Sequence, residues 1–118
     1  MDLKTSLPQN APADIVYSLP ANFTCKGDKM DGHFCVTKEK IYIYNGSEIT
    51  LEYSIDDFSE FECKQQIGTS MVQGTLKSGE TICFCGFSQD QFLRYAELMK
   101  LLDHCLRTGE LMEITDTE

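Results

Sequence analysis

A single helical pattern at the end of a strand-rich chain limits the folds open to this sequence. Apolar residues recur at helical spacing between Ser88 and Gly109, and the stripe consists of Phe92, Tyr95, Ala96, Met99, Leu102 and Leu106. Ser88 and Gln91 predict a reciprocal capping box, and Gly109 predicts a left-handed cap at the helix end. The stripe predicts that the helix covers a sheet, so we expect any working surface on the strands and loops.

Short strands precede this helix. Alternation is clearest over Glu48–Ile55, where the odd-numbered residues from Ile49 to Ile55 are apolar and are expected to face the core. The other expected strands cover residues 32–37, 40–44, 58–65, 70–77 and 80–86, with a first strand at 15–17 or 22–26 because Pro20 disfavours one continuous strand. Six or seven strands at this spacing predict a sandwich or a small barrel.

Turn residues separate these segments. Lys26–Gly32 contains two glycines and two aspartates and is expected to be a linker. Asn45–Gly46 is a strong hairpin signal, because a type I′ turn needs positive φ at both central positions. Further reversals are expected at Lys38–Glu39, Asp56–Asp57, Gly68 and Ser78–Gly79.

The length of 118 residues suits one domain. Residues 1–14 are expected to form a flexible lead-in, 15–109 the domain, and 110–118 an acidic tail or the start of a linker. The net charge of −9 disfavours nucleic acid and anionic membranes as partners. No stretch approaches the roughly 20 apolar residues of a membrane span. The first 20 residues lack the apolar region of a secretory signal, so a cytoplasmic location is expected.

The six cysteines are Cys25, Cys35, Cys63, Cys83, Cys85 and Cys105. Cys83 and Cys85 are two residues apart and would share one face of a strand. Without an export signal, we expect reduced thiols that act as small buried apolar groups. A zinc site built on Cys83 and Cys85 is the alternative, but the paired spacing of a zinc knuckle is missing.

No residue pattern indicates catalysis. His33 and His104 are the only histidines, and no nucleophile signature surrounds a cysteine. The carboxylates Asp56, Asp57, Glu60 and Glu62 lack a calcium-loop spacing and are expected to be solvated, with Glu60 and Glu62 on the wet face of a strand. The sequence therefore predicts a non-enzymatic protein without a cofactor or metal site.

Tyr42 and Tyr44 alternate with the inward-facing Ile41 and Ile43. Exposed tyrosines often mark protein contacts, so these two are the candidate contact residues. The alternative is that a curved strand buries both of its faces.

Two segments resemble a known family. Residues 32–43 resemble the hairpin of bacterial pleckstrin-homology-like domains, including GRAM-type members, and residues 51–58 resemble their step from a strand to Ile-x-Asp-Ile. The resemblance implies a mainly β fold, a barrel of six or seven antiparallel strands capped by one C-terminal helix. It also implies binding to a partner rather than catalysis.

A narrower likeness spans residues 31–109. Gly74-Thr75-Leu76, Gly79-Glu80 and Cys83–Ser88 are similar to motifs in the N-terminal cytoplasmic domains of some ABC exporters from anaerobic Gram-positive bacteria. The likeness implies an interaction or regulatory module whose partner is a protein or the rest of a longer transporter chain. The alternatives are a lipid-surface adaptor of the same fold, or a small metal- or thiol-dependent protein using Cys83 and Cys85. Lys26 and Lys29 are offset by Asp28 and Asp31, which disfavours a phosphoinositide headgroup.

Overall fold

The computed structural model describes residues 14–45, 48–65 and 69–111, and these form strands followed by a helix. The strands are β1 (Tyr17–Phe23), β2 (Lys29–Val36), β3 (Lys40–Asn45), β4 (Glu48–Ser54), β5 (Phe58–Gln65), β6 (Ser70–Leu76) and β7 (Thr81–Phe87). Two 3-10 turns, η1 (Ile55–Asp57) and η2 (Gln89–Gln91), precede β5 and the helix α1 (Phe92–Thr108). The predicted succession of strands and one final helix is confirmed.

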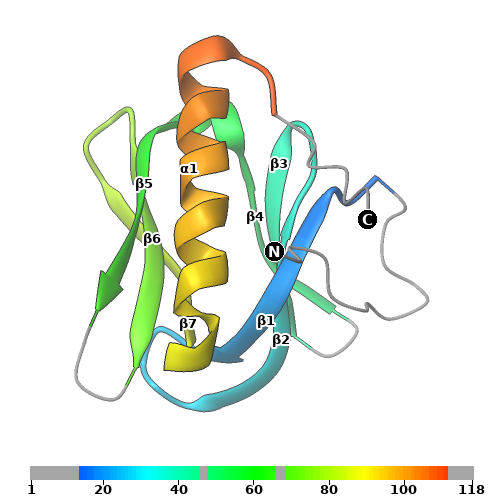
Figure 1. The fold of residues 1–118 in the computed structure, drawn as a ribbon, viewed down its shortest axis with the longest axis vertical. Coiled ribbons are helices and arrows are strands. Elements are labelled where there is room, and N and C mark those ends of the chain that lie inside the picture. Colours follow the sequence, from blue (N-terminus) through cyan, green and yellow to red (C-terminus); the bar gives the residue numbers. More distant parts are fainter. Residues whose placement is uncertain (1–13, 46–47, 66–68, 112–118) are drawn as a thin grey trace.

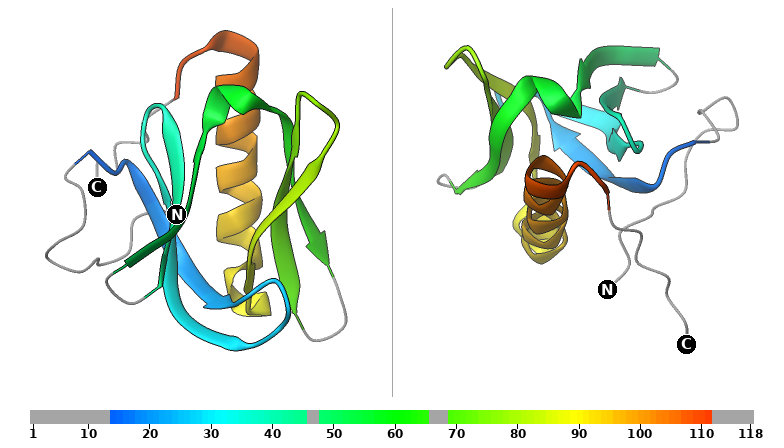
Figure 2. Two further views of the ribbon diagram at one scale, coloured as in Figure 1. Left: turned by 180° about the vertical axis from the view of Figure 1, so that it is seen from behind. Right: turned by 90° about the horizontal axis from the view of Figure 1, so that it is seen from above.

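All seven strands belong to one antiparallel sheet with the order β4-β3-β2-β1-β7-β6-β5. The predictions of a mainly β fold, antiparallel strands and one C-terminal helix are therefore confirmed, but the predicted barrel is only partly formed, because the sheet is open and β4 and β5 are its two edges. The turn η1 redirects the chain between them, with Ile55 buried. Figures 1 and 2 show the curved sheet with α1 on one face, and β4 and β5 on either side of the helix.

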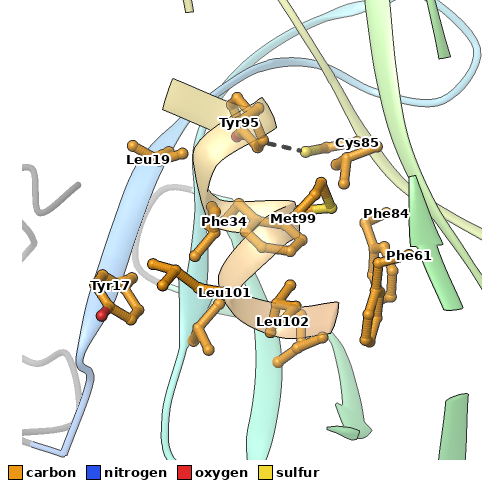
Figure 3. Close-up of a cluster of buried hydrophobic side chains, with 14 of the residues drawn as sticks. Tyr17, Leu19, Phe34, Phe61, Phe84, Cys85, Tyr95, Met99, Leu101 and Leu102 are labelled. Carbon is orange, nitrogen blue, oxygen red and sulfur yellow. Dashed lines mark hydrogen bonds between the residues drawn. The ribbon is translucent and has the colours of Figure 1, made fainter. Parts of the chain in front are cut away.

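Tyr95, near the start of α1, contacts two strands of the sheet. Its side chain is fully buried and stacks on Phe87 with ring centroids 4.0 Å apart, while Phe34 meets it edge-on at 5.8 Å. Its hydroxyl donates a hydrogen bond of 2.7 Å to the Pro20 carbonyl oxygen and lies 3.8 Å from Cys85 Sγ (Figure 3). A buried ring with a satisfied hydroxyl stabilises the core without leaving an unpaired polar group.

The buried face of α1 is wider than the predicted stripe. Tyr95, Met99 and Leu102 are buried as expected. Leu98, Leu101 and Cys105 are also buried, although the stripe did not include them. Leu98, Leu101 and Cys105 recur at helical spacing and lie together on one flank of the stripe, so the buried face is wider than predicted on that side.

The predicted cap is present at the C-terminal end of the helix and absent at its N-terminal end. Gly109 has φ of 81° and donates its N–H to the Cys105 carbonyl oxygen at 2.7 Å, as a left-handed cap does. The capping box is wrong. The amide of Gln91 bonds the backbone oxygen of Ser88 in the turn η2, and the Ser88 hydroxyl instead contacts Asp90 and Asn22.

The joint between β1 and β7 has few backbone contacts. Phe23 and Gly86 form its one register pair, whereas β1 pairs with β2 at six positions. A side chain supplements this joint, because Asn22 Oδ1 accepts hydrogen bonds from the Ser88 amide at 3.0 Å and from its hydroxyl at 3.2 Å.

Two expectations about the first strands are wrong. β1 runs through Pro20 as one strand, because Pro20 pairs with His33 of β2 and has no register partner on the β7 side, where its missing N–H would matter. β2 begins at Lys29, inside the expected linker, because the turn is confined to the residues between Phe23 and Lys29. The expected hairpin between β3 and β4 forms, but Asn45 is the last residue of β3 and pairs with Glu48, so it is not a central residue of the turn with positive φ. Gly46 and Gly68 lie outside the described residues.

Gly32 provides a test of the close approach between β2 and β3. A Cβ atom at this position would clash with the backbone carbonyl oxygen of Tyr44. We expect Gly32→Ala to lower the free energy of unfolding by about 1–3 kcal/mol, because a strand backbone must shift. Urea denaturation measures the change. The neighbouring exposed Asp31→Ala is the control, and equal stability of the two variants would contradict the prediction.

Tyr95→Phe isolates the hydroxyl from the ring. The variant keeps the stacking on Phe87 but leaves the Pro20 carbonyl oxygen without its donor. We expect a loss of about 0.5–1.5 kcal/mol in the free energy of unfolding, the net contribution of one hydrogen bond to an acceptor that is partly buried. Phe92→Leu, which changes a half-buried ring at the helix start, is the control for a mild apolar change. Unchanged stability of Tyr95→Phe would show that the bond contributes nothing.

Candidate functional site

The candidate contact residues Tyr42 and Tyr44 lie on the sheet face opposite the helix. Tyr44 is only 3% exposed and packs with Ile15 and Cys35 in a second, small apolar cluster. Tyr42 packs against the same cluster but is half-buried. Tyr44 is thus buried, as the alternative of a curved strand with two buried faces predicted. Tyr42 is the one of the two tyrosines that has exposed surface available for a partner.

Ile49 adds an apolar group to this face. The register shifts between Ile43 and Tyr44 of β3, so that Ile43 pairs with Leu51 and Tyr44 pairs with Ile49. Thr50 is the extra residue, and this bulge moves Ile49 to the outer face, where it is 43% exposed. The expectation that Ile49 faces the core is wrong for this reason.

An ion pair borders the same face. Lys40 Nζ lies 3.0 Å from Glu52 Oε2, and Glu52 pairs with Tyr42 across β3 and β4. The hydrogen bond with Glu52 raises the pKa of Lys40, and burial raises the pKa of Tyr42, so both keep their protons at neutral pH. We call Lys40, Tyr42, Ile49 and Glu52 the β3–β4 outer surface. It offers an exposed apolar side chain and an aromatic one beside two opposite charges.

A disulfide bond joins Cys25 and Cys83, with their Cα atoms 6.2 Å apart, so the expectation of six reduced cysteines is wrong. Cys25 lies in the turn after β1, and the pairing of β1 with β7 brings this turn beside Cys83. Because β1 and β7 are far apart in the sequence, no local residue pattern indicates that Cys25 and Cys83 are neighbours. The bond spans 58 residues, and the chain entropy lost on closing such a loop corresponds to about 4 kcal/mol of stability.

Cys83 and Cys85 face opposite sides of β7, contrary to the prediction. Val72 pairs with Cys85 and Gln73 pairs with Cys83, so Phe84 is an extra residue in β7. This bulge reverses the alternation. Phe84 and Cys85 both enter the core, while Cys83 bonds Cys25 and lies 3.9 Å from the Met71 sulfur. The two cysteines therefore do not form a joint metal or thiol site.

The four remaining cysteines are free thiols, of which Cys35, Cys85 and Cys105 are buried and Cys63 is half-buried. Burial raises the pKa of Cys35, Cys63 and Cys85 to about 12 in each case. Because the thiolate is the reactive form, these three thiols are poor nucleophiles at neutral pH.

The other candidate polar residues are dispersed. Glu60 and Glu62 are exposed on β5, as expected for the wet face, and accept hydrogen bonds from Thr75 Oγ1 and Gln73 Nε2 at 3.4 and 2.7 Å. Asp56 and Asp57 are exposed in η1, His33 is on β2 and His104 is on α1. Within the described ranges, no three His, Cys, Asp or Glu side chains are grouped so that they could hold a metal ion.

Two observations concern lipid surfaces. Lys26, Asp28, Lys29 and Asp31 are all exposed around the turn after β1, so opposite charges alternate there as the sequence suggested. Across residues 14–45, 48–65 and 69–111, no helix has the length and apolar character that a membrane span requires.

The buried thiols predict a loss of stability at alkaline pH. A thiol whose pKa rises from 9.0 to about 12 on folding stays protonated in the folded state, while the unfolded chain ionises above pH 9. Stability is thus fully present below pH 9 and falls as the pH rises towards 12. We expect about 1 kcal/mol of loss per buried thiol between pH 8 and pH 10.

Urea denaturation at the two pH values measures this loss. A Cys25→Ser/Cys83→Ser background prevents thiol–disulfide exchange at high pH. Adding Cys85→Ser should reduce the loss of stability between pH 8 and pH 10 by the contribution of one buried thiol, about 1 kcal/mol. Equal stability at pH 8 and pH 10 would contradict the assignment of the shifts to burial.

The geometry thus leaves two features with functional potential, the β3–β4 outer surface and the Cys25–Cys83 bond. Sequence reasoning identified Tyr42 but missed Ile49 and the disulfide, because a bulge and a nonlocal strand pairing create them. Comparison of the sequence with protein-family models and with curated proteins found no match.

Proposed function

We propose that the chain is a pleckstrin-homology-like domain that binds a protein partner and has no enzymatic activity of its own. The support from the fold is the succession of seven antiparallel strands in one curved sheet, followed by a C-terminal helix on its inner face. The apolar face of the helix is committed to the core through Tyr95, Leu98 and Leu102, so the partner does not bind that face.

The observation that carries this proposal is the exposed Ile49 on an edge strand. Among the described strands, β4 has a neighbour on one side only, so alternate backbone groups along it are free of this ladder and can pair with an added segment. Tyr42 lies on the adjacent strand with part of its ring exposed. An apolar side chain of a partner can cover Ile49 and contact Tyr42, and its backbone can pair with β4.

The resemblance to exporter domains suggests where the partner is. We propose that the domain is the N-terminal cytoplasmic module of an ABC exporter, and that it binds another protein or a later part of the same longer chain. Regulation of the transporter through this contact is the function that the β3–β4 outer surface supports best.

Photo-crosslinking tests the surface directly. A photoreactive amino acid replaces Ile49 in the natural full-length protein, expressed in its own cell type. Leu93 is the matched control, because it is a large apolar residue that is 69% exposed but lies on the helix. We expect one specific protein adduct from position 49 and none from position 93. Equal adducts from both positions, or none from position 49, would refute the surface.

Two further measurements distinguish the alternatives. The partner identified by crosslinking can then be tested for binding without a crosslinker. Ile49→Lys should weaken its affinity at least about tenfold, a loss of about 1.4 kcal/mol of binding, whereas Leu93→Lys should leave the affinity unchanged. Sedimentation with anionic vesicles tests the lipid-surface adaptor. Salt-sensitive binding to these vesicles, without a protein adduct, would replace the protein-contact function by the lipid one.

A further inference from the structure

We propose that the Cys25–Cys83 bond is a reversible thiol–disulfide exchange site, which a dithiol reductant opens, and that its redox state controls how firmly β1 is joined to β7. The inference does not depend on the identity of the partner. It rests on the position of the bond at the joint between β1 and β7, on the exposure of Cys25, and on the burial of the competing thiols.

The turn after β1 presents Cys25 to solvent. The hydroxyl oxygen of Thr24 accepts hydrogen bonds from the amides of Lys26 and Asp28 at 3.3 and 3.2 Å, and its carbonyl oxygen accepts one from the Gly27 amide at 2.9 Å. These bonds define a tight turn in which Cys25 is exposed, whereas Cys83 is half-buried in β7. A thiolate from solvent therefore reaches Cys25 Sγ more readily than Cys83 Sγ.

The bond reinforces a joint with few backbone contacts. β1 belongs with β2, β3 and β4 on one side of this joint, and β7 belongs with β6 and β5 on the other. Besides the disulfide, the contacts at the joint include the Phe23 and Gly86 pair, the Asn22 contacts with Ser88, and the Tyr95 bond to Pro20. Breaking the disulfide leaves these contacts in place but removes the covalent restraint on the end of β1.

The other thiols do not compete with this pair. Cys35, Cys85 and Cys105 are buried, and burial holds the pKa values of Cys35 and Cys85 near 12. The remaining thiol, Cys63, is half-buried on β5. When the reduced protein is reoxidised, the bond therefore forms again between Cys25 and Cys83, and a site with two redox states requires this.

Reduction of the bond takes two thiol–disulfide exchange steps. One thiolate of the dithiol attacks Cys25 Sγ and forms a mixed disulfide, the Cys25–Cys83 bond breaks, and Cys83 leaves as a thiolate that takes up a proton. The second thiol of the reductant, as its thiolate, then attacks the reductant's first sulfur, which is bonded to Cys25 Sγ in the mixed disulfide. Cys25 leaves as a thiolate and takes up a proton. The protein gains two electrons and two protons, and the dithiol becomes a cyclic disulfide.

Native-state labelling and hydrogen exchange test the proposal on the full chain. The protein, purified without reductant, is treated with dithiothreitol at neutral pH without denaturant and then alkylated. We expect two additional labels, at Cys25 and Cys83. A parallel sample, from which the dithiol is removed and which is reoxidised before alkylation, should carry neither of these labels. Amides at the end of β1 should exchange at least about tenfold faster in the reduced protein, while those of α1 change little.

The Cys25→Ser/Cys83→Ser variant is the matched control. It should show the fast exchange of β1 in the absence of dithiothreitol and no further response to it. Cys63→Ser, which leaves the disulfide intact, should behave as the unmodified protein does.

Four outcomes would overturn the proposal. They are six free thiols in the protein as purified, labelling of Cys25 and Cys83 only after denaturant is added, labelling without faster exchange of β1, and faster exchange throughout α1 as well. The second would make the bond an inaccessible staple, and the fourth would make it a requirement for the whole fold.

Discussion

The contact of Tyr95 with the sheet is the interaction on which the rest of the structure depends. Its ring stacks on Phe87 of β7, and its hydroxyl bonds the Pro20 carbonyl oxygen of β1. One helix residue thus bridges the two strands that share the fewest ladder contacts. This contact occupies the buried face of α1, so that face is unavailable to a partner.

The two functional features lie away from this core. The β3–β4 outer surface depends on a bulge at Thr50, which turns Ile49 outwards, and the disulfide depends on a bulge at Phe84, which turns Cys83 away from Cys85. Each bulge adds one residue to a strand and reverses the faces beyond it. A strand that is read as strictly alternating therefore places these side chains on the wrong face.

Much of the fold could be predicted from local signals. β5 has the predicted bounds, Gly109 caps the helix as expected, and Tyr95, Met99 and Leu102 face the core. These features depend on residues near one another in the sequence. The continuous strand through Pro20, the open sheet and the cysteine pairing could not be predicted, since each depends on which strands are neighbours.

The sequence by itself determined the class of the protein, strands followed by one helix with a buried apolar face, because the spacing of apolar residues and the turn residues act over a few positions. It also identified Tyr42 as a candidate contact residue. Only the tertiary structure decided that Ile49 is exposed and that Cys25 bonds Cys83. Bulges and the adjacency of β1 and β7 depend on how strands distant in the sequence pair across the whole sheet, and no short segment specifies them.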